Sequence, residues 1–117
     1  MYLVTISGLP LVLTYGSVAK DLAMKLVPEA IKMHDPEAEV VVFEPADLVQ
    51  WRRGEVMMCR IDSDRFDNIS HRQAVVSAVA DAFRGIRSSM ISDTTELKTC
   101  KVVIYTGLLN IDLETII

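Results

Sequence analysis

The order of strand and helix patterns along the chain is the feature that most limits its possible folds. Short runs rich in β-branched residues predict four strands, at about 2–7, 38–44, 55–62 and 100–107. Helical spacing of apolar residues predicts one helix at about 16–34 and another at about 70–86. The order is therefore β-α-β followed by β-α-β. A helical crossover makes the two strands of each half parallel, with a right-handed connection.

This order predicts an α+β protein built as a duplicated β-α-β two-layer sandwich. We expect a four-stranded sheet with both helices on one face. A chain of 117 residues is expected to form a single domain, 1–117. Its two halves would be about 1–44 and 55–107, and the tail 108–117 would form another short strand or dock on a neighbour.

Local signals set the expected ends of the two helices. Ser17 is placed to cap the first helix, and Pro28 predicts a kink or break near Val27. Ser70 and Gln73 have the spacing of a capping box, in which each residue satisfies a free backbone donor of the other. We therefore expect the second helix to begin at Ser70.

An apolar sheet face without a helix layer is the main reason to expect self-association. Half of the residues are apolar, and the mean hydropathy is +0.30. We expect the face away from the helices to carry alternate apolar residues such as Val40, Val42, Val102 and Ile104. A large exposed apolar face is typical of an interface, so a homo-oligomer follows.

Charge and composition exclude several classes of partner. The net charge of −4 and the pI near 5.1 argue against nucleic acid, which needs a basic surface. No apolar run reaches the ~20 residues of a membrane span, and no secretory signal is present, so we expect a cytoplasmic protein.

The cysteines and histidines do not form a metal-binding pattern. Cys59 and Cys100 lie in apolar strands, which favours buried reduced thiols over a disulfide or metal pair. His34 and His71 lack metal-ligand spacing to the cysteines, and both are expected at helix ends with surface roles. We expect no metal and no cofactor, because nucleotide-binding fingerprints are also missing from the sequence.

Two known folds share this order of elements, and the connection between the halves favours one of them. In ferredoxin-like sandwiches the second and third strands are normally joined by a tight hairpin, whereas here about ten residues intervene, containing "ADLVQWRRGE". The strand "VVVFE", this connection with its Gly turn, and the late strand "CKVVIYTGLLN" resemble the tautomerase superfamily. That superfamily includes 4-oxalocrotonate tautomerase, 5-carboxymethyl-2-hydroxymuconate isomerase and macrophage migration inhibitory factor.

The resemblance implies a homotrimer with active sites between subunits and an N-terminal proline as general base. This sequence has Met1-Tyr2 at the terminus, and its nearest proline, Pro10, lies inside the chain. Methionine is normally removed only before a small residue, so Met1 is expected to stay. The Met1 amine is then a candidate base, since desolvation lowers the pKa of an amine. The alternative is that Met1 is an ordinary strand end.

The resemblance also implies that arginines bind the carboxylate of the substrate, because a guanidinium can make two parallel hydrogen bonds to it. Arg52 and Arg53 lie in the corresponding loop, beside Trp51, and Arg60 lies on the strand that follows. Tyr105 could donate a hydrogen bond to a developing enolate. The simpler alternatives are a structural tyrosine, a tryptophan at an interface, and an Arg60 that forms an intersubunit ion pair with Asp62 or Asp64.

These residues support one main functional hypothesis and two alternatives. The main one is a tautomerase or isomerase acting on a small keto–enol carboxylate. The first alternative is a non-catalytic, homo-oligomeric protein on the same scaffold that binds a small ligand or a protein. The second is a ferredoxin-like domain for small-molecule sensing or assembly.

Overall fold

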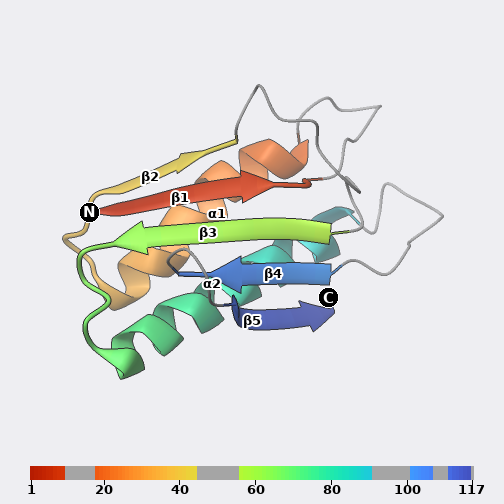
Figure 1. Ribbon diagram of the computed structural model, residues 1–117. Coiled ribbons are helices and arrows are strands. Elements are labelled where there is room, and N and C mark those ends of the chain that lie inside the picture. The colour runs from red at the N-terminus through yellow and green to blue at the C-terminus, as the bar shows by residue number, and fades with distance from the viewer. Residues whose placement is uncertain (10–17, 45–55, 91–100, 107–110, 117) are drawn as a thin grey trace.

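The computed structural model describes residues 1–9, 18–44, 56–90, 101–106 and 111–116 (Figure 1). Its elements are β1 (Tyr2–Ser7), α1 (Val18–His34), β2 (Val40–Phe43), β3 (Val56–Ser63), α2 (Ile69–Met90), β4 (Lys101–Tyr105) and β5 (Ile111–Ile116). The predicted order β-α-β, β-α-β is confirmed. The prediction of four strands is wrong by one, because the apolar tail forms β5 and pairs with β4. The segments that carry Ser17 and the predicted short strand near 48–50 lie outside the described residues.

The strands form one sheet in the order β2-β1-β3-β4-β5. Both pairs joined by a helix, β1 with β2 and β3 with β4, are parallel, as predicted. The two halves meet where β1 and β3 pair antiparallel. A ferredoxin-like sheet is a split β-α-β arrangement, in which another strand separates the two strands of a unit. Here the strands of each unit are neighbours, so the ferredoxin-like alternative is excluded.

Both helices cover one face of the sheet, and the core lies between these two layers (Figure 1). Tyr2, Val4 and Ile6 alternate along β1 with less buried residues, which is the two-residue period of a strand that has one face in the core. They pack with residues of α2 such as Val79 and Phe83, all of them fully buried. The hydrophobic core therefore lies between the helices and the side of the sheet that faces them.

The residues predicted for the uncovered face of the sheet lie on the face toward the helices. Val102 and Ile104 are fully buried toward the helices, and Val40 and Val42 pack against the same core. The other face carries the alternate positions, among them Leu3, Val41, Phe43, Met58, Val103 and Tyr105. A shift of one residue exchanges the two faces of a strand. The run of three valines in β2 is apolar on both faces, so alternation could not assign them.

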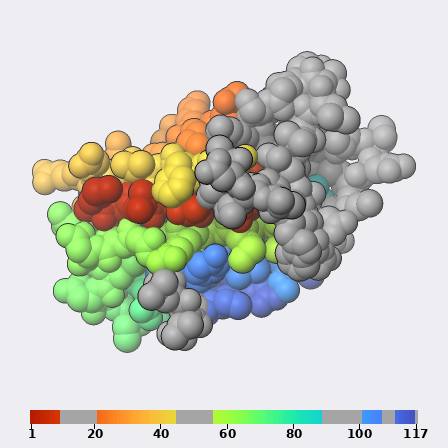
Figure 2. Space-filling model, turned by 45° about the horizontal axis from the view of Figure 1, so that its top comes forward, coloured from red at the N-terminus to blue at the C-terminus, as the bar shows by residue number. Residues whose placement is uncertain are grey.

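Figure 2 shows how the strands lie side by side on this uncovered face, with β1 in red between β2 in yellow and β3 in green. Val41 and Phe43 of β2 are more than a third exposed, and Ile111 and Ile116 of β5 are more than half exposed. The described part of the chain thus exposes large apolar side chains at both edges of the sheet.

The two helices differ from prediction at specific residues. α1 continues through Pro28 as far as His34, so the predicted break does not occur. α2 begins with Asn68 as its cap: the Asn68 side chain accepts a hydrogen bond of 3.2 Å from the backbone N–H of His71. The predicted capping box at Ser70 is therefore wrong by two residues.

Two further sequence expectations concern cysteine and the membrane. Cys59 is a free, fully buried thiol, and burial raises its pKa, so the prediction of a buried reduced thiol is confirmed for this residue. Cys100 lies outside the described residues. Among the described segments, neither helix has the length and apolar character needed to cross a bilayer.

Candidate functional site

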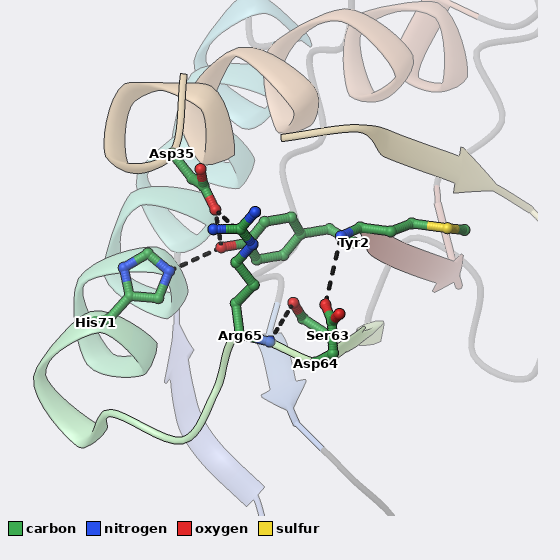
Figure 3. A network of polar contacts seen from close by, with 7 residues as sticks. Tyr2, Asp35, Ser63, Asp64, Arg65 and His71 are labelled. Carbon is green, nitrogen blue, oxygen red and sulfur yellow. Dashed lines mark hydrogen bonds and ion pairs between the residues drawn. The ribbon is translucent and has the colours of Figure 1, made fainter. Parts of the chain in front are cut away.

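A buried tyrosine organises a polar cluster at the end of the sheet where β1 begins. Tyr2 is fully buried, and its hydroxyl group lies 3.0 Å from Asp35 Oδ2 and 2.7 Å from His71 Nε2 (Figure 3). Asp35 directly follows α1, and His71 lies in the first turn of α2. One side chain of β1 therefore connects the end of one helix to the beginning of the other.

The surroundings of Tyr2 keep its phenol protonated. Burial, followed by the hydrogen bond to Asp35 and the negative charge of that carboxylate, raises the pKa of Tyr2 to about 12. The phenol proton is directed to Asp35, because a carboxylate can only accept a hydrogen bond. At neutral pH Tyr2 is thus a hydrogen-bonding group and not a charged one.

The segment between β3 and α2 completes the cluster. Arg65 Nε lies 3.5 Å from Asp35 Oδ2, so the charge of this carboxylate is balanced. The backbone N–H of Arg65 donates to Ser63 Oγ at 3.1 Å. The ring of Phe66 packs edge-on against the ring of Tyr2, with 5.7 Å between centroids. Phe66 therefore packs the turn against β1, and Arg65 connects it to the end of α1.

An open pocket of about 560 Å³ lies at this cluster. Its lining residues come from the end of α1, the β3–α2 turn and the start of α2: His34, Asp35, Asp64, Arg65, Asp67, Asn68 and His71. A pocket with an imidazole held by hydrogen bonds and a nearby guanidinium has the groups for proton transfer and for binding an anion. No group of residues in the described part of the chain has the arrangement of a metal site.

The amino group of Met1 lies close to this pocket, in a carboxylate-rich setting. Its nitrogen is 3.4 Å from Asp64 Oδ1, and both side chains are more than half exposed. A hydrogen bond from the Met1 ammonium, and then its positive charge, lower the pKa of Asp64. A second, shallower hollow of about 410 Å³ is lined by Met1, Leu3, Asp62, Ser63 and Asp64. Asp64 is common to both pockets, so the two are adjacent.

Two other predicted site residues lie together on the uncovered face of the sheet. Arg60 and Tyr105 are register partners on β3 and β4. Arg60 Nε lies 3.1 Å from Asp62 Oδ2 of the same chain. Met1 precedes the register pair formed by Tyr2 and Ser63, so it does not lie beside Tyr105. Arg52, Arg53 and Trp51 lie outside the described residues.

Sequence reasoning missed the cluster around Tyr2, and it did not connect His71, expected at a helix end, with Tyr2. One signal was available: Tyr2 is in step with Val4 and Ile6, which indicates burial, and a buried phenol normally has a hydrogen-bond partner. The partners Asp35 and His71 are 33 and 69 residues away from Tyr2. No local spacing connects residues so far apart, so their contact became visible only in the folded chain.

Comparisons with known proteins identify the fold. No protein-family model and no curated protein sequence matches the chain. Among solved structures, a protein described as "Q0 fused 4-OT wild type symmetric trimer" is similar at TM-score 0.55 and 11% identity. The match covers 92% of this chain and 85% of that one. The crystal structure of native Ps01740 is similar at TM-score 0.51 and 13% identity, covering 92% of both chains.

At these identities the likeness concerns the fold. The protein has the fold of the tautomerase superfamily, to which 4-OT (4-oxalocrotonate tautomerase) belongs, as its strand order also indicates. The fold expected from the resemblance is therefore confirmed. The activity is a separate question, because one scaffold can support several functions.

Proposed function

We propose that this protein is a homotrimeric tautomerase or isomerase that moves a proton on a small keto–enol carboxylate. The observation that carries the proposal is the pair of adjacent pockets at the beginning of β1, on a tautomerase-type fold. These pockets bring together an amine, an imidazole and a guanidinium. Those groups match a reaction that needs a proton acceptor and a carboxylate anchor.

The proposed roles follow from chemistry and position. Arg52, Arg53 and Arg60 bind the substrate carboxylate, and Trp51 lines the site. Tyr105, opposite Arg60 in the sheet, donates a hydrogen bond to the developing enolate. Among the described residues, the pairing of Arg60 with Asp62 involves Nε, and the terminal nitrogens are the ones we propose to bind a carboxylate.

The trimer is supported by the uncovered sheet face. Its exposed apolar residues include Val41, Phe43 and Ile111, and a monomer would leave them in water. The similar structure of the fused 4-OT is itself a symmetric trimer. We propose that three copies pack these faces together, so that residues on β3 and β4 of one subunit approach the terminus of the next.

A second candidate function is a non-catalytic oligomer that binds a small ligand or a protein. The observation that favours it is the state of the Met1 amine, which pairs with Asp64 as an ammonium. An ammonium has no lone pair with which to accept a proton. Position 2 is also tyrosine, where the resemblance implies a terminal proline. On this alternative the pockets bind ligand without turnover.

An assay on phenylpyruvate- and hydroxymuconate-type enols separates the two functions. We expect turnover by the wild-type protein and a large loss for the double variant Arg52→Ala/Arg53→Ala. Arg84→Ala is a matched control, because Arg84 pairs with Asp81 on the exposed side of α2, outside both pockets. The absence of turnover across the panel would reject the enzyme and favour the binding protein.

A further inference from the structure

We propose that His71 is the catalytic base of this site, with Arg65 as a carboxylate anchor and with Tyr2 and Asp35 as positioning residues. The proposal rests on the proposed tautomerase function and names the group that accepts the proton. It gives a role to the polar pocket of about 560 Å³, none of whose residues was predicted as part of the site.

The hydrogen bonds around Tyr2 assign the proton on the imidazole. The single phenol proton of Tyr2 is donated to Asp35 Oδ2, at 3.0 Å. The contact of 2.7 Å between the phenol oxygen and His71 Nε2 must then use a proton supplied by Nε2. A neutral His71 with its proton on Nε2 has its lone pair on Nδ1. The network therefore makes Nδ1 the nitrogen that accepts protons.

The position of Nδ1 suits this role. Figure 3 shows this nitrogen on the side of the ring that faces away from Tyr2, and the ring lines the pocket. In the described part of the chain no residue forms a hydrogen bond with Nδ1. When Nδ1 takes up a proton, the contact from Nε2 to Tyr2 is retained, and Asp35 behind Tyr2 stabilises the positive ring. This arrangement resembles the way a carboxylate orients a catalytic histidine.

The charges that face His71 come from three segments, and most of them are balanced. On the α1 side, Asp35 is paired with Arg65, and His34 lies at the rim. In the β3–α2 turn, Asp64 is paired with the Met1 amine, which leaves the charge of Asp67. The first turn of α2 itself contributes the partial positive charge of a helix N-terminus. An anionic substrate therefore does not meet an unbalanced cluster of carboxylates.

Arg65 has the geometry to hold the carboxylate of the substrate beside His71. Its contact with Asp35 uses Nε, and its side chain is about half exposed. The two terminal nitrogens of a guanidinium form the fork that binds a carboxylate with two hydrogen bonds. In a small 2-keto acid the keto carbon carries the carboxylate, and the carbon that loses a proton is the next one along. We propose that this carbon lies in the same pocket when Arg65 binds the carboxylate.

The reaction needs no oxidant or cofactor. Nδ1 of His71 removes a proton from the carbon beside the keto group, and the C–H electron pair becomes the C=C bond of the enolate. The negative charge moves to the carbonyl oxygen. The imidazolium then returns the proton to this oxygen to give the enol, or to a carbon to give the isomer. Every atom and charge is accounted for within the substrate and His71.

The central test is the variant His71→Ala in the full chain, assayed with phenylpyruvate. General-base catalysis typically contributes about 10²–10⁴-fold, so kcat should fall by that factor. Added imidazole should restore part of the rate in proportion to its concentration, because the variant leaves an open space where the ring was. Arg84→Ala is the control: it removes a charged side chain from the same helix, outside both pockets, and should leave kcat unchanged. A kcat that persists in His71→Ala would overturn the proposal.

Two further variants separate catalysis from structure. Tyr2→Phe keeps the ring and removes the link to Asp35, so kcat should fall about tenfold or more with little change in KM. Arg65→Lys should mainly raise KM, because lysine lacks the fork. If His71→Ala is unfolded by circular dichroism, His71→Asn takes its place, and a folded His71→Asn with wild-type kcat would also overturn the proposal. The absence of turnover by the wild type rejects the proposed function itself, whereas wild-type turnover without loss in the histidine variants rejects only this role.

Discussion

Tyr2 connects three segments that are distant in the sequence, and it does so through a single oxygen atom. Its ring is part of the core, whereas its hydroxyl group contacts Asp35 after α1 and His71 in α2. The aromatic ring is thus buried among apolar side chains, and the hydroxyl group has hydrogen-bond partners, as a buried tyrosine requires. A residue that looks like an ordinary strand position therefore lies at the centre of the polar cluster.

The phenol of Tyr2 should make folding stability depend on pH in the alkaline range. Its pKa is about 12 in the folded protein, against an ordinary value of 10.0. A raised pKa means that the folded state holds the proton more tightly. The stabilisation is therefore complete below about pH 10 and is lost as the pH rises from about 10 to about 12.

Urea unfolding of wild type and Tyr2→Phe at several alkaline pH values measures this effect. The difference in stability between the two proteins should shrink across the same range. The wild type has one phenol more than Tyr2→Phe. The phenolate absorbance of this extra group should appear near pH 12, after that of ordinary tyrosines. If that absorbance appears near pH 10, the burial and hydrogen bonding of Tyr2 are not as described.

At the scale of elements, Gly8 ends β1 in a conformation that favours glycine. Its φ is 80°, and a Cβ at this position would collide with the backbone carbonyl of Val56. Gly8→Ala should therefore lower the free energy of unfolding by about 1–3 kcal/mol for the strained backbone alone, and by more for the collision. The measurement is urea denaturation.

Gly85 provides the matched control for that substitution. It lies inside α2, where an added Cβ would make ordinary contact with Leu26 at 3.7 Å. Gly85→Ala should raise stability by about 0.4–1 kcal/mol, since alanine restricts the unfolded chain and favours a helix. Equal effects of the two substitutions would contradict the conformation assigned to Gly8.

The cap of α2 can be tested with two neighbouring residues. Asn68 accepts the backbone hydrogen bond from His71, so Asn68→Ala should cost about 1 kcal/mol of stability. Ser70, which the sequence pattern suggested as the cap, is exposed and lies inside the helix. Ser70→Ala should change stability by less than about 0.5 kcal/mol. Thermal or urea unfolding of both variants checks the assignment, and the reverse order of effects would restore the predicted capping box.

At the scale of the whole molecule, the uncovered sheet face determines how copies of the chain associate. Val103 lies on this face, between Met58 on β3 and Glu114 on β5 in the sheet register. Val103→Lys should convert a trimer to monomers, because three added charges would have to leave water. Val103 is only partly buried within one chain, so the monomer should keep its fold.

Sedimentation equilibrium of wild type and variant measures this change. Met33→Lys is the control, because Met33 is a highly exposed apolar residue of α1, on the helix side of the molecule. It should leave the oligomer intact. A wild-type protein that sediments as a monomer would contradict the trimer.

The elements and their connections follow from local properties of the sequence. Alternation in strands, the 3.6-residue period in helices and the long joint between the halves are local properties, and they predicted two β-α-β units with parallel strands. They also predicted that the Cys59 thiol is buried, as the structure confirms. The chirality and length of a helical crossover leave few arrangements, which is why the fold was predictable.

Three features could be assigned only from the folded chain: the buried face of β2 and β4, the cap of α2, and the residues of the polar cluster. Val40 and Val41 are equally apolar, so their faces depend on the register with β1. Asp35 and His71 both reach Tyr2 because α1 ends and α2 begins beside the start of β1. Contacts between residues so distant in the chain arise from packing, and packing is a property of the whole fold.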